Sequence, residues 1–193
     1  QKIWASAPDG ALQFDPETEK FTEFKSVNYK TPNGNAMTYG VAADRHGNGW
    51  WAQMGSDTIG KGNMETGKSE EFKLPEVAGV RARQTPEAMK AYEHNEIGFN
   101  FPFPWQQGPR RMGTDKNADI LYVAASWGGH LVKIDTKSYR VTGRFATKTS
   151  QGTCRKDWTG MAMSADSKTL LLSCSENGLL FLSTSTGRLT AYD

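Results

Sequence analysis

The sequence predicts an all-β fold, because short apolar runs alternate with tight polar turns and because this pattern is repeated along the chain. The pattern is clearest over residues 39–75. Its four runs are Tyr39–Ala43, Trp50–Met54, Thr58–Lys61 and Ser69–Phe72. Gly, Asn and Asp fill the segments between the runs, and these residues supply the positive φ angles and the side-chain-to-backbone bonds of tight turns. Each run is therefore predicted to be one strand of an antiparallel meander.

A single sheet of this size cannot bury both of its faces and must stack on others. The sequence contains copies of the meander at four places. The four copies cover about residues 1–25, 37–75, 108–146 and 158–193. Each has a polar turn before its last strand, and these turns begin at Asp15, Asn63, Asp135 and Ser183. The turns lie 48, 72 and 48 residues apart, so the middle interval equals one repeat plus an insertion of about 24 residues. A period in the forties with four strands per unit predicts a β-propeller rather than a β-sandwich.

The first copy has runs for only three strands and lacks the innermost one. We expect residues 1–193 to form one propeller domain of about four blades, the first incomplete. Such a chain is either a fragment of a larger propeller or a half-ring that needs a partner to close, and we favour the fragment. Additional blades or a protein partner are therefore expected to complete it.

Composition limits the class of protein further. The chain has 193 residues, 37% of them hydrophobic, which suffices for one domain with a real core. Its formal net charge of +2 gives no basic footprint for nucleic acid. No apolar run approaches the roughly 20 residues that a membrane-spanning helix needs.

Several motifs of the repeats are similar to a known family. In the second repeat they are Tyr39–Asp44, Gly47–Trp51, Asp57–Lys61 and Glu65–Lys68, and in the third they are Gly108–Met112, Asn117, Trp127–Gly129 and Leu131–Asp135. These motifs resemble the blade consensus of the virginiamycin B lyase-like (streptogramin lyase) propellers. The fourth repeat, in Met163–Asp166 and Lys168–Leu170, is also similar to YVTN or lactonase-type propellers. The resemblance covers most of the chain outside the insertion.

This resemblance implies the fold and leaves two kinds of function open. One is a binding or scaffold propeller, periplasmic or secreted, that contacts a protein partner through its inserted loop. The other is a metal-dependent lyase or a lactonase-like hydrolase with its site over the propeller axis. In the lyases, a His and a Glu near the axis open a cyclic peptide ester with Mg²⁺. We match no residue here to that site, and Gln53 stands where these blades often carry an acid.

Residues 76–107 form the insertion, which has no blade pattern. Thr85–Glu87 predict the start of a helix, with Thr as N-cap, Pro at the first helical position and Glu in the first turn. The helix is expected to end near Gly98. Phe99–Gln107 then contain too many prolines and aromatic residues for a regular element, so we expect a stiff, extended segment. Because it joins the outer strand of one blade to the inner strand of the next, it should lie on the face where propellers bind ligands.

Arginine and aromatic side chains in and beside the insertion are the candidate ligand- or partner-binding residues. They are Arg81, Arg83, Tyr92, Phe99, Phe101, Phe103, Trp105, Arg110 and Arg111. Together they could stack a planar or anionic ligand or form a protein-binding surface, since Trp, Tyr and Arg are common interface anchors. The alternative is that the aromatic residues pack on the blades and the arginines form a solvated rim.

No catalytic residue is assigned from the sequence, and no metal site. His46 is expected in a solvated turn and His130 at the start of a strand, where both are structural. His94 and Glu96 are two residues apart and do not share one face of a helix. The chain has no HExxH and no GxSxG motif.

Cys154 and Cys174 are predicted to form a disulfide bond. Cys154 precedes the inner strand of the fourth blade and Cys174 ends its second strand, so the two antiparallel neighbours bring them together. An exported protein would oxidise them, whereas two buried free thiols are the alternative. We expect intact mass under denaturing conditions to show alkylation of both cysteines only after reduction. Alkylation without a reductant would contradict the bond.

Overall fold

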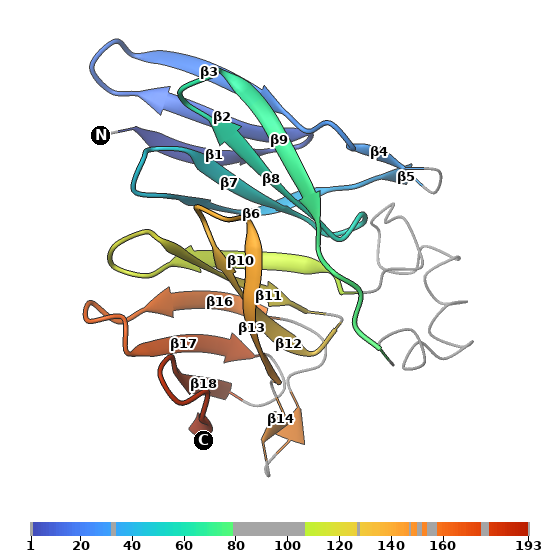
Figure 1. The fold of residues 1–193 in the computed structure, drawn as a ribbon, viewed down its shortest axis with the longest axis vertical. Helices are drawn as coiled ribbons and strands as arrows, with labels where there is room; N and C mark the ends of the chain where they lie inside the picture. Colours follow the sequence, from blue (N-terminus) through green and yellow to red (C-terminus); the bar gives the residue numbers. More distant parts are fainter. Residues whose placement is uncertain are drawn as a thin grey trace.

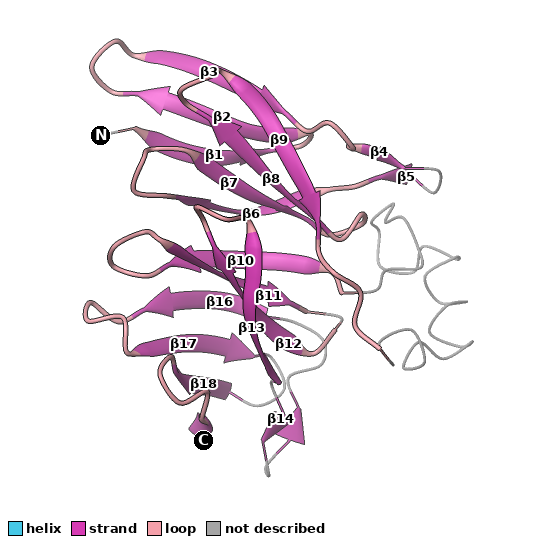
Figure 2. Ribbon diagram, viewed as in Figure 1, coloured by secondary structure: helices cyan, strands magenta, loops and turns pink. Residues whose placement is uncertain are grey.

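The computed structural model describes residues 2–31, 34–78, 107–126, 128–146, 148–149, 152–153, 158–174 and 178–192. Across these ranges the chain consists of strands, turns and loops, with no helix (Figure 2). It follows that these ranges hold no helix with the length and apolarity to cross a membrane. The helix predicted to start at Thr85 and the aromatic segment that follows it lie outside the described residues.

Four antiparallel sheets follow one another along the chain, each a meander in chain order (Figure 1). The first contains β1 (Ile3–Ala7), β2 (Gly10–Asp15) and β3 (Lys20–Lys25). The second contains β6 (Thr38–Ala43), β7 (Gly49–Gln53), β8 (Thr58–Asn63) and β9 (Lys68–Lys73). The third contains β10 (Pro109–Thr114), β11 (Ile120–Ala125), β12 (His130–Asp135) and β13 (Arg140–Ala146). The fourth contains β16 (Trp158–Met163), β17 (Thr169–Cys174), β18 (Gly178–Ser183) and β19 (Leu189–Tyr192). The all-β prediction and the four-repeat pattern are confirmed.

Three of the predicted turn residues, Asp15, Asn63 and Asp135, anchor the last turn of the first three sheets in the same way. Oδ1 of Asp15 accepts a hydrogen bond from the amide two residues on, at 3.0 Å. Oδ1 of Asn63 and Oδ1 of Asp135 do the same, at 3.0 and 3.1 Å. These are the local bonds for which Asp and Asn are favoured in turns. These turns also show which strands correspond in different blades. When the turns are aligned, β1 corresponds to β7, which is the second strand of its sheet. The first sheet therefore has three strands, as predicted.

The sheets meet through their first strands. β10 packs against β6 on one side and against β16 on the other, so these inner strands lie side by side (Figure 1). In a meander of four strands, the outer strand ends at the edge where the next inner strand begins. All three links between blades therefore lie at one end of the sheets, which we call the linker face.

Two short hairpins occur in these links and were not predicted. β4 (Lys30–Thr31) pairs with β5 (Gly34–Asn35) between the first and second blades. β14 (Lys148–Thr149) pairs with β15 (Gly152–Thr153) between the third and fourth. Strands of two residues carry no hydrophobic alternation, so the sequence pattern had no signal for them.

Apolar layers fill the spaces between successive blades. Between the first two blades the layer includes Ala11, Phe24 and Trp51. Between the second and third it includes Trp50, Ile59, Leu121, Val123, Val132 and Ile134. Between the third and fourth it includes Leu131, Leu170, Leu172, Leu180 and Leu182. The second and third sheets therefore bury both faces, and the first and fourth sheets each bury one face against a neighbour. Stacking of this kind is how repeats that cannot fold alone become stable.

Each of the three inner strands has a β-bulge at the same position. The register with the second strand shifts between Thr38 and Val41, between Pro109 and Met112, and between Trp158 and Gly160. Within the bulge of β6, Gly40 lies against the backbone of β10. A Cβ atom at Gly40 would come within 2.3 Å of the carbonyl oxygen of Arg110, so a side chain there would push the two blades apart.

We expect Gly40→Ala to lower the free energy of unfolding by roughly 1–3 kcal/mol, because it overpacks the contact between β6 and β10. Gly113→Ala is the matched control on β10, since a Cβ atom there meets nothing within 4 Å. Urea unfolding of both variants measures the difference. Equal changes in the two variants would show that the blades do not need this close approach.

Candidate functional site

Of the nine candidate binding residues, only Arg110 and Arg111 lie within the described ranges. The other seven, Arg81, Arg83, Tyr92, Phe99, Phe101, Phe103 and Trp105, lie outside the described residues. Cys154 lies outside them as well, so its disulfide bond stays a prediction. The backbone of Cys174 pairs with Trp158 at the end of β17. Three features of the described ranges bear on function, and two of them lie at the linker face.

The first feature joins the two ends of the insertion. Nε2 of Gln107 donates a hydrogen bond of 3.0 Å to the carbonyl oxygen of Pro75. Arg144, on β13, donates from Nη2 to the same carbonyl at 2.9 Å and from Nη1 to Oε1 of Gln107 at 2.9 Å. Gln107 is fully buried. The chain therefore leaves the second blade and returns to the third at a single fixed point.

Asp57 fixes this point to the second blade. It lies in the turn between β7 and β8 with a φ of 54° and is 4% exposed. Its carboxylate accepts hydrogen bonds from the backbone N–H groups of Gln107, at 3.0 and 3.1 Å, and of Gly108, at 2.8 Å. A buried carboxylate needs such donors, because an uncompensated buried charge is costly. The end of the insertion, at Gln107 and Gly108, is thus held by hydrogen bonds from its backbone N–H groups to the buried carboxylate of Asp57.

His130 completes the network, which we call the insertion base: Asp57, Pro75, Gln107, His130 and Arg144. Nη1 of Arg144 lies 2.6 Å from Nε2 of His130. Because a guanidinium can only donate, Nε2 is the acceptor, and Nδ1 carries the proton and donates to the carbonyl oxygen of Gly128 at 3.0 Å. Burial lowers the pKa of Arg144, and the charge of Asp57 acts in the opposite direction. His130 is thus structural, as expected, and His46 is exposed.

The second feature is a cluster of Tyr39, Arg110 and Arg111 on the inner strands. Nη2 of Arg110 and Nη2 of Arg111 both donate to the hydroxyl oxygen of Tyr39, at 3.0 and 3.2 Å. The two guanidinium carbons lie 4.5 and 4.6 Å from the centre of the Tyr39 ring, within the range of cation–π attraction. The sequence identified both arginines but missed Tyr39, which was assigned only to a strand.

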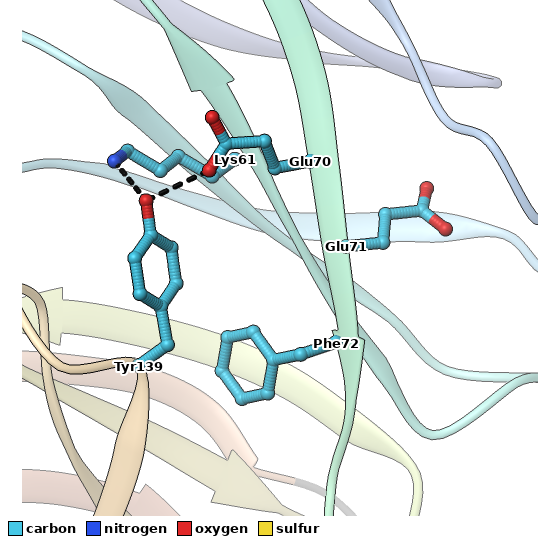
Figure 3. Close-up of a pocket in the computed structure, with 5 residues that line it drawn as sticks. All are labelled: Lys61, Glu70, Glu71, Phe72 and Tyr139. Atoms are coloured by element: carbon cyan, nitrogen blue, oxygen red, sulfur yellow. Dashed lines mark hydrogen bonds between the residues drawn. The ribbon is translucent and has the colours of Figure 1, made fainter.

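The third feature is a hollow of about 200 Å³ between the second and third blades (Figure 3). It is lined by Lys61, Glu70, Glu71, Phe72 and Tyr139. The hydroxyl of Tyr139 accepts a hydrogen bond from Nζ of Lys61 and donates one of 2.7 Å to Oε2 of Glu70. Nζ of Lys61 also lies 4.7 Å from the ring centre of Tyr139 and 5.4 Å from that of Trp50. This arrangement fastens two blades together, with every polar group of the trio engaged.

Gln53 and Glu71 are also engaged in hydrogen bonds within the second blade. Gln53 is fully buried; its Nε2 donates to Oε1 of Glu71 at 3.2 Å, and its Oε1 accepts from Ser56 at 3.1 Å. In the described ranges, no three His, Cys, Asp or Glu side chains gather in a way that could hold a metal ion.

Comparison with known proteins bears on the fold. No family model and no curated protein matches the sequence. A streptogramin B lyase structure matches with a TM-score of 0.67 and 16% identity, over 100% of this chain and 51% of that one. Virginiamycin B lyase from Staphylococcus aureus matches with a TM-score of 0.67 and 16% identity, over 100% of this chain and 52% of that one. The chain has the β-propeller fold of these lyases.

The chain spans about half the length of those lyase structures. A further match is the extracellular domain of a one-component system from B. thetaiotaomicron, with a TM-score of 0.60 and 16% identity, over 100% of this chain and 22% of that one. At these identities the likeness shows the fold alone. Activity has to be argued from the residues of this chain.

We expect Tyr139→Phe to lower the free energy of unfolding at pH 7 by roughly 1–3 kcal/mol, because it leaves Lys61 and Glu70 without their shared partner. Hydrogen bonds from Asn63 and then Tyr139 lower the pKa of Glu70. The stability that Glu70 contributes is therefore present above the unfolded pKa of about 4.3 and is lost as the pH falls through the lower folded pKa. The difference between wild type and variant should accordingly narrow between pH 5 and pH 3.

Urea unfolding at pH 7, 5 and 3 checks this prediction. Tyr192→Phe is the matched control, because Tyr192 is 67% exposed and its loss of a hydroxyl should change little at any pH. A difference for Tyr139→Phe that stays constant with pH would show that Glu70 does not share in the interaction.

Proposed function

We propose that this chain is a binding β-propeller that docks a protein partner on its linker face, through the insertion at residues 76–107. The observation that carries the proposal is the insertion base. Three buried or half-buried polar side chains, Asp57, Gln107 and Arg144, are committed to holding the two ends of one excursion. Loops of this length in compact domains are usually functional when they are not disordered.

The composition of the insertion supports a protein partner. Phe99, Phe101, Phe103 and Trp105 alternate with polar residues and prolines in what we expect to be an extended arm. Alternation places the four aromatic side chains on one side, and the prolines reduce the entropy lost on docking. Four buried aromatic residues of roughly 150–250 Å² each would dominate an interface of standard size.

An exported location fits this role. One of the structures of similar fold is an extracellular domain. We place this chain likewise in the periplasm or outside the cell, where the partner would meet the linker face and any further blades of a larger propeller would pack beside the first and fourth sheets.

Trp105→Ala tests the proposal. We expect the variant to keep its thermal midpoint and to lose its partner when the immobilised chain is incubated with extract and the bound proteins are quantified by mass spectrometry. Phe21→Ala is the matched control, because Phe21 is an aromatic residue 68% exposed on the first blade, away from the linker face. A protein retained by wild type and Phe21→Ala but lost with Trp105→Ala is the predicted outcome.

If the midpoint of Trp105→Ala falls by several degrees while association is unchanged, the aromatic residues pack on the blades and the docking proposal is wrong. Replacing residues 77–106 with a short Gly-Ser linker separates the two cases further. Pro75 and Gln107 are already joined by a hydrogen bond of 3.0 Å, so the shortened chain can close without moving the blades.

A further inference from the structure

The insertion base contains a side chain of the type that changes its charge near neutral pH. His130 is the first residue of β12 and is 6% exposed. The ordinary pKa of histidine, about 6.5, lies inside the range in which the other side chains normally keep one charge state. The protonation state of His130 therefore decides which hydrogen bonds the insertion base can make as the pH falls from 7 to 5.

Both ring nitrogens of His130 are engaged in a way that only the neutral imidazole allows. Nε2 lies 2.6 Å from Nη1 of Arg144 and has to accept, because a guanidinium can only donate. Nδ1 carries the proton and donates to the carbonyl oxygen of Gly128 at 3.0 Å. A protonated imidazole has an N–H donor at both nitrogens. Protonation would thus set two donors and two positive charges against each other, and the bond from Arg144 would be lost.

Arg144 cannot leave His130 without disturbing the rest of the insertion base. Its Nη1 also donates to Oε1 of Gln107, and its Nη2 donates to the carbonyl oxygen of Pro75, both at 2.9 Å. Because the guanidinium is a rigid plane, a movement that separates Nη1 from Nε2 of His130 also moves the other donors. The bonds from Arg144 to both ends of the insertion therefore depend on a neutral His130.

The charged groups around His130 come from neighbouring elements. Arg144, on β13, contacts it directly, and Asp57, in the turn between β7 and β8, acts on Arg144 through its charge. Glu76 follows the end of β9 and is exposed. The partner of His130 on β11 is the uncharged Ala125. The group that meets the imidazole edge is thus a cation, which disfavours a second positive charge there.

Asp57 does not share this dependence on His130. Its carboxylate accepts from the backbone N–H groups of Gln107 and Gly108, and such bonds favour the ionised form. The end of the insertion at Gln107 should therefore stay in place when Arg144 moves away. At the other end, the carbonyl of Pro75 would retain the bond from Nε2 of Gln107 and lose the one from Arg144.

We propose that the insertion base is an acid-sensitive switch, in which protonation of His130 displaces Arg144 and loosens the insertion at Pro75. The loosening is a property of the blades and of the two ends of the insertion. Its consequence, that acid weakens the docking of a partner, rests on the proposed function.

The test is an NMR titration of the ¹³C,¹⁵N-labelled chain from pH 8 to pH 5, without any partner. The imidazole nitrogens of His130 report its protonation. The carbonyl ¹³C of Pro75 and the side-chain amide of Gln107 report the bonds from Arg144. We expect the Pro75 and Gln107 signals to shift with the same midpoint as His130. The exposed His46, in the turn between β6 and β7, should titrate without affecting either signal.

His130→Gln separates the switch from other effects of acid, because glutamine offers Arg144 an acceptor and does not titrate. In this variant the Pro75 and Gln107 signals should stay constant from pH 8 to pH 5. His46→Gln is the matched control and should behave as wild type does. Equal thermal midpoints at pH 8 establish that both variants are folded.

Three outcomes would overturn the proposal. His130 could remain neutral down to pH 5, or it could titrate while the Pro75 and Gln107 signals stay unchanged. The same shifts in wild type and His130→Gln would show that another group responds to acid. No partner enters this titration, so its failure leaves the docking proposal standing, and failure of docking in the Trp105→Ala experiment leaves the titration valid.

Discussion

The close approach of the inner strands is the constraint on which the rest of the structure depends. β6 and β10 come so near that Gly40 has no space for a side chain beside the backbone of Arg110. Because the inner strands are packed against one another, the sheets have to spread outward, and apolar layers fill the wedges between them. The same packing places the bulges of β6 and β10 next to each other, which is why Tyr39 lies within reach of two arginines from the next blade.

At the outer edge of the blades the spacing is set by polar contacts, and β9 provides them on both faces. Glu70 and Glu71 are consecutive, so their side chains point in opposite directions (Figure 3). Glu70 accepts from Tyr139 of the third blade, whereas Glu71 accepts from the amides of Val27 and Asn28, in the link from the first, at 2.6 and 2.9 Å. Charge-assisted bonds of this kind are stronger and more directional than apolar contacts. One strand can thereby fix the position of its blade relative to both neighbours.

The sequence predicted the blades well because their signals are local. Turns anchored by Asp15, Asn63 and Asp135 need only one side chain and the amide two residues on, so the residue type and its spacing suffice. The insertion base was missed for the opposite reason. Asp57 and Gln107 are 50 residues apart, and Arg144 is further still along the chain. Asp57 was assigned to a turn, where it does lie, and nothing in its neighbourhood shows that its carboxylate holds another blade.

The repeat itself offers a way to separate structural residues from functional ones. Where a residue is required by the fold, equivalent positions of different blades require the same kind of side chain. Asp44 and Asp115 illustrate this, because their carboxylates accept hydrogen bonds of 2.9 and 2.8 Å from nearby amides. Where the residue type differs in one blade and packing does not explain the difference, the fold does not determine that residue. Arg111 meets this condition, since its counterparts Gly40 and Gly160 are glycines and its own guanidinium has only Tyr39 as a hydrogen-bond partner in the described ranges. The packing of the blades therefore gives no reason for a charged side chain at this position.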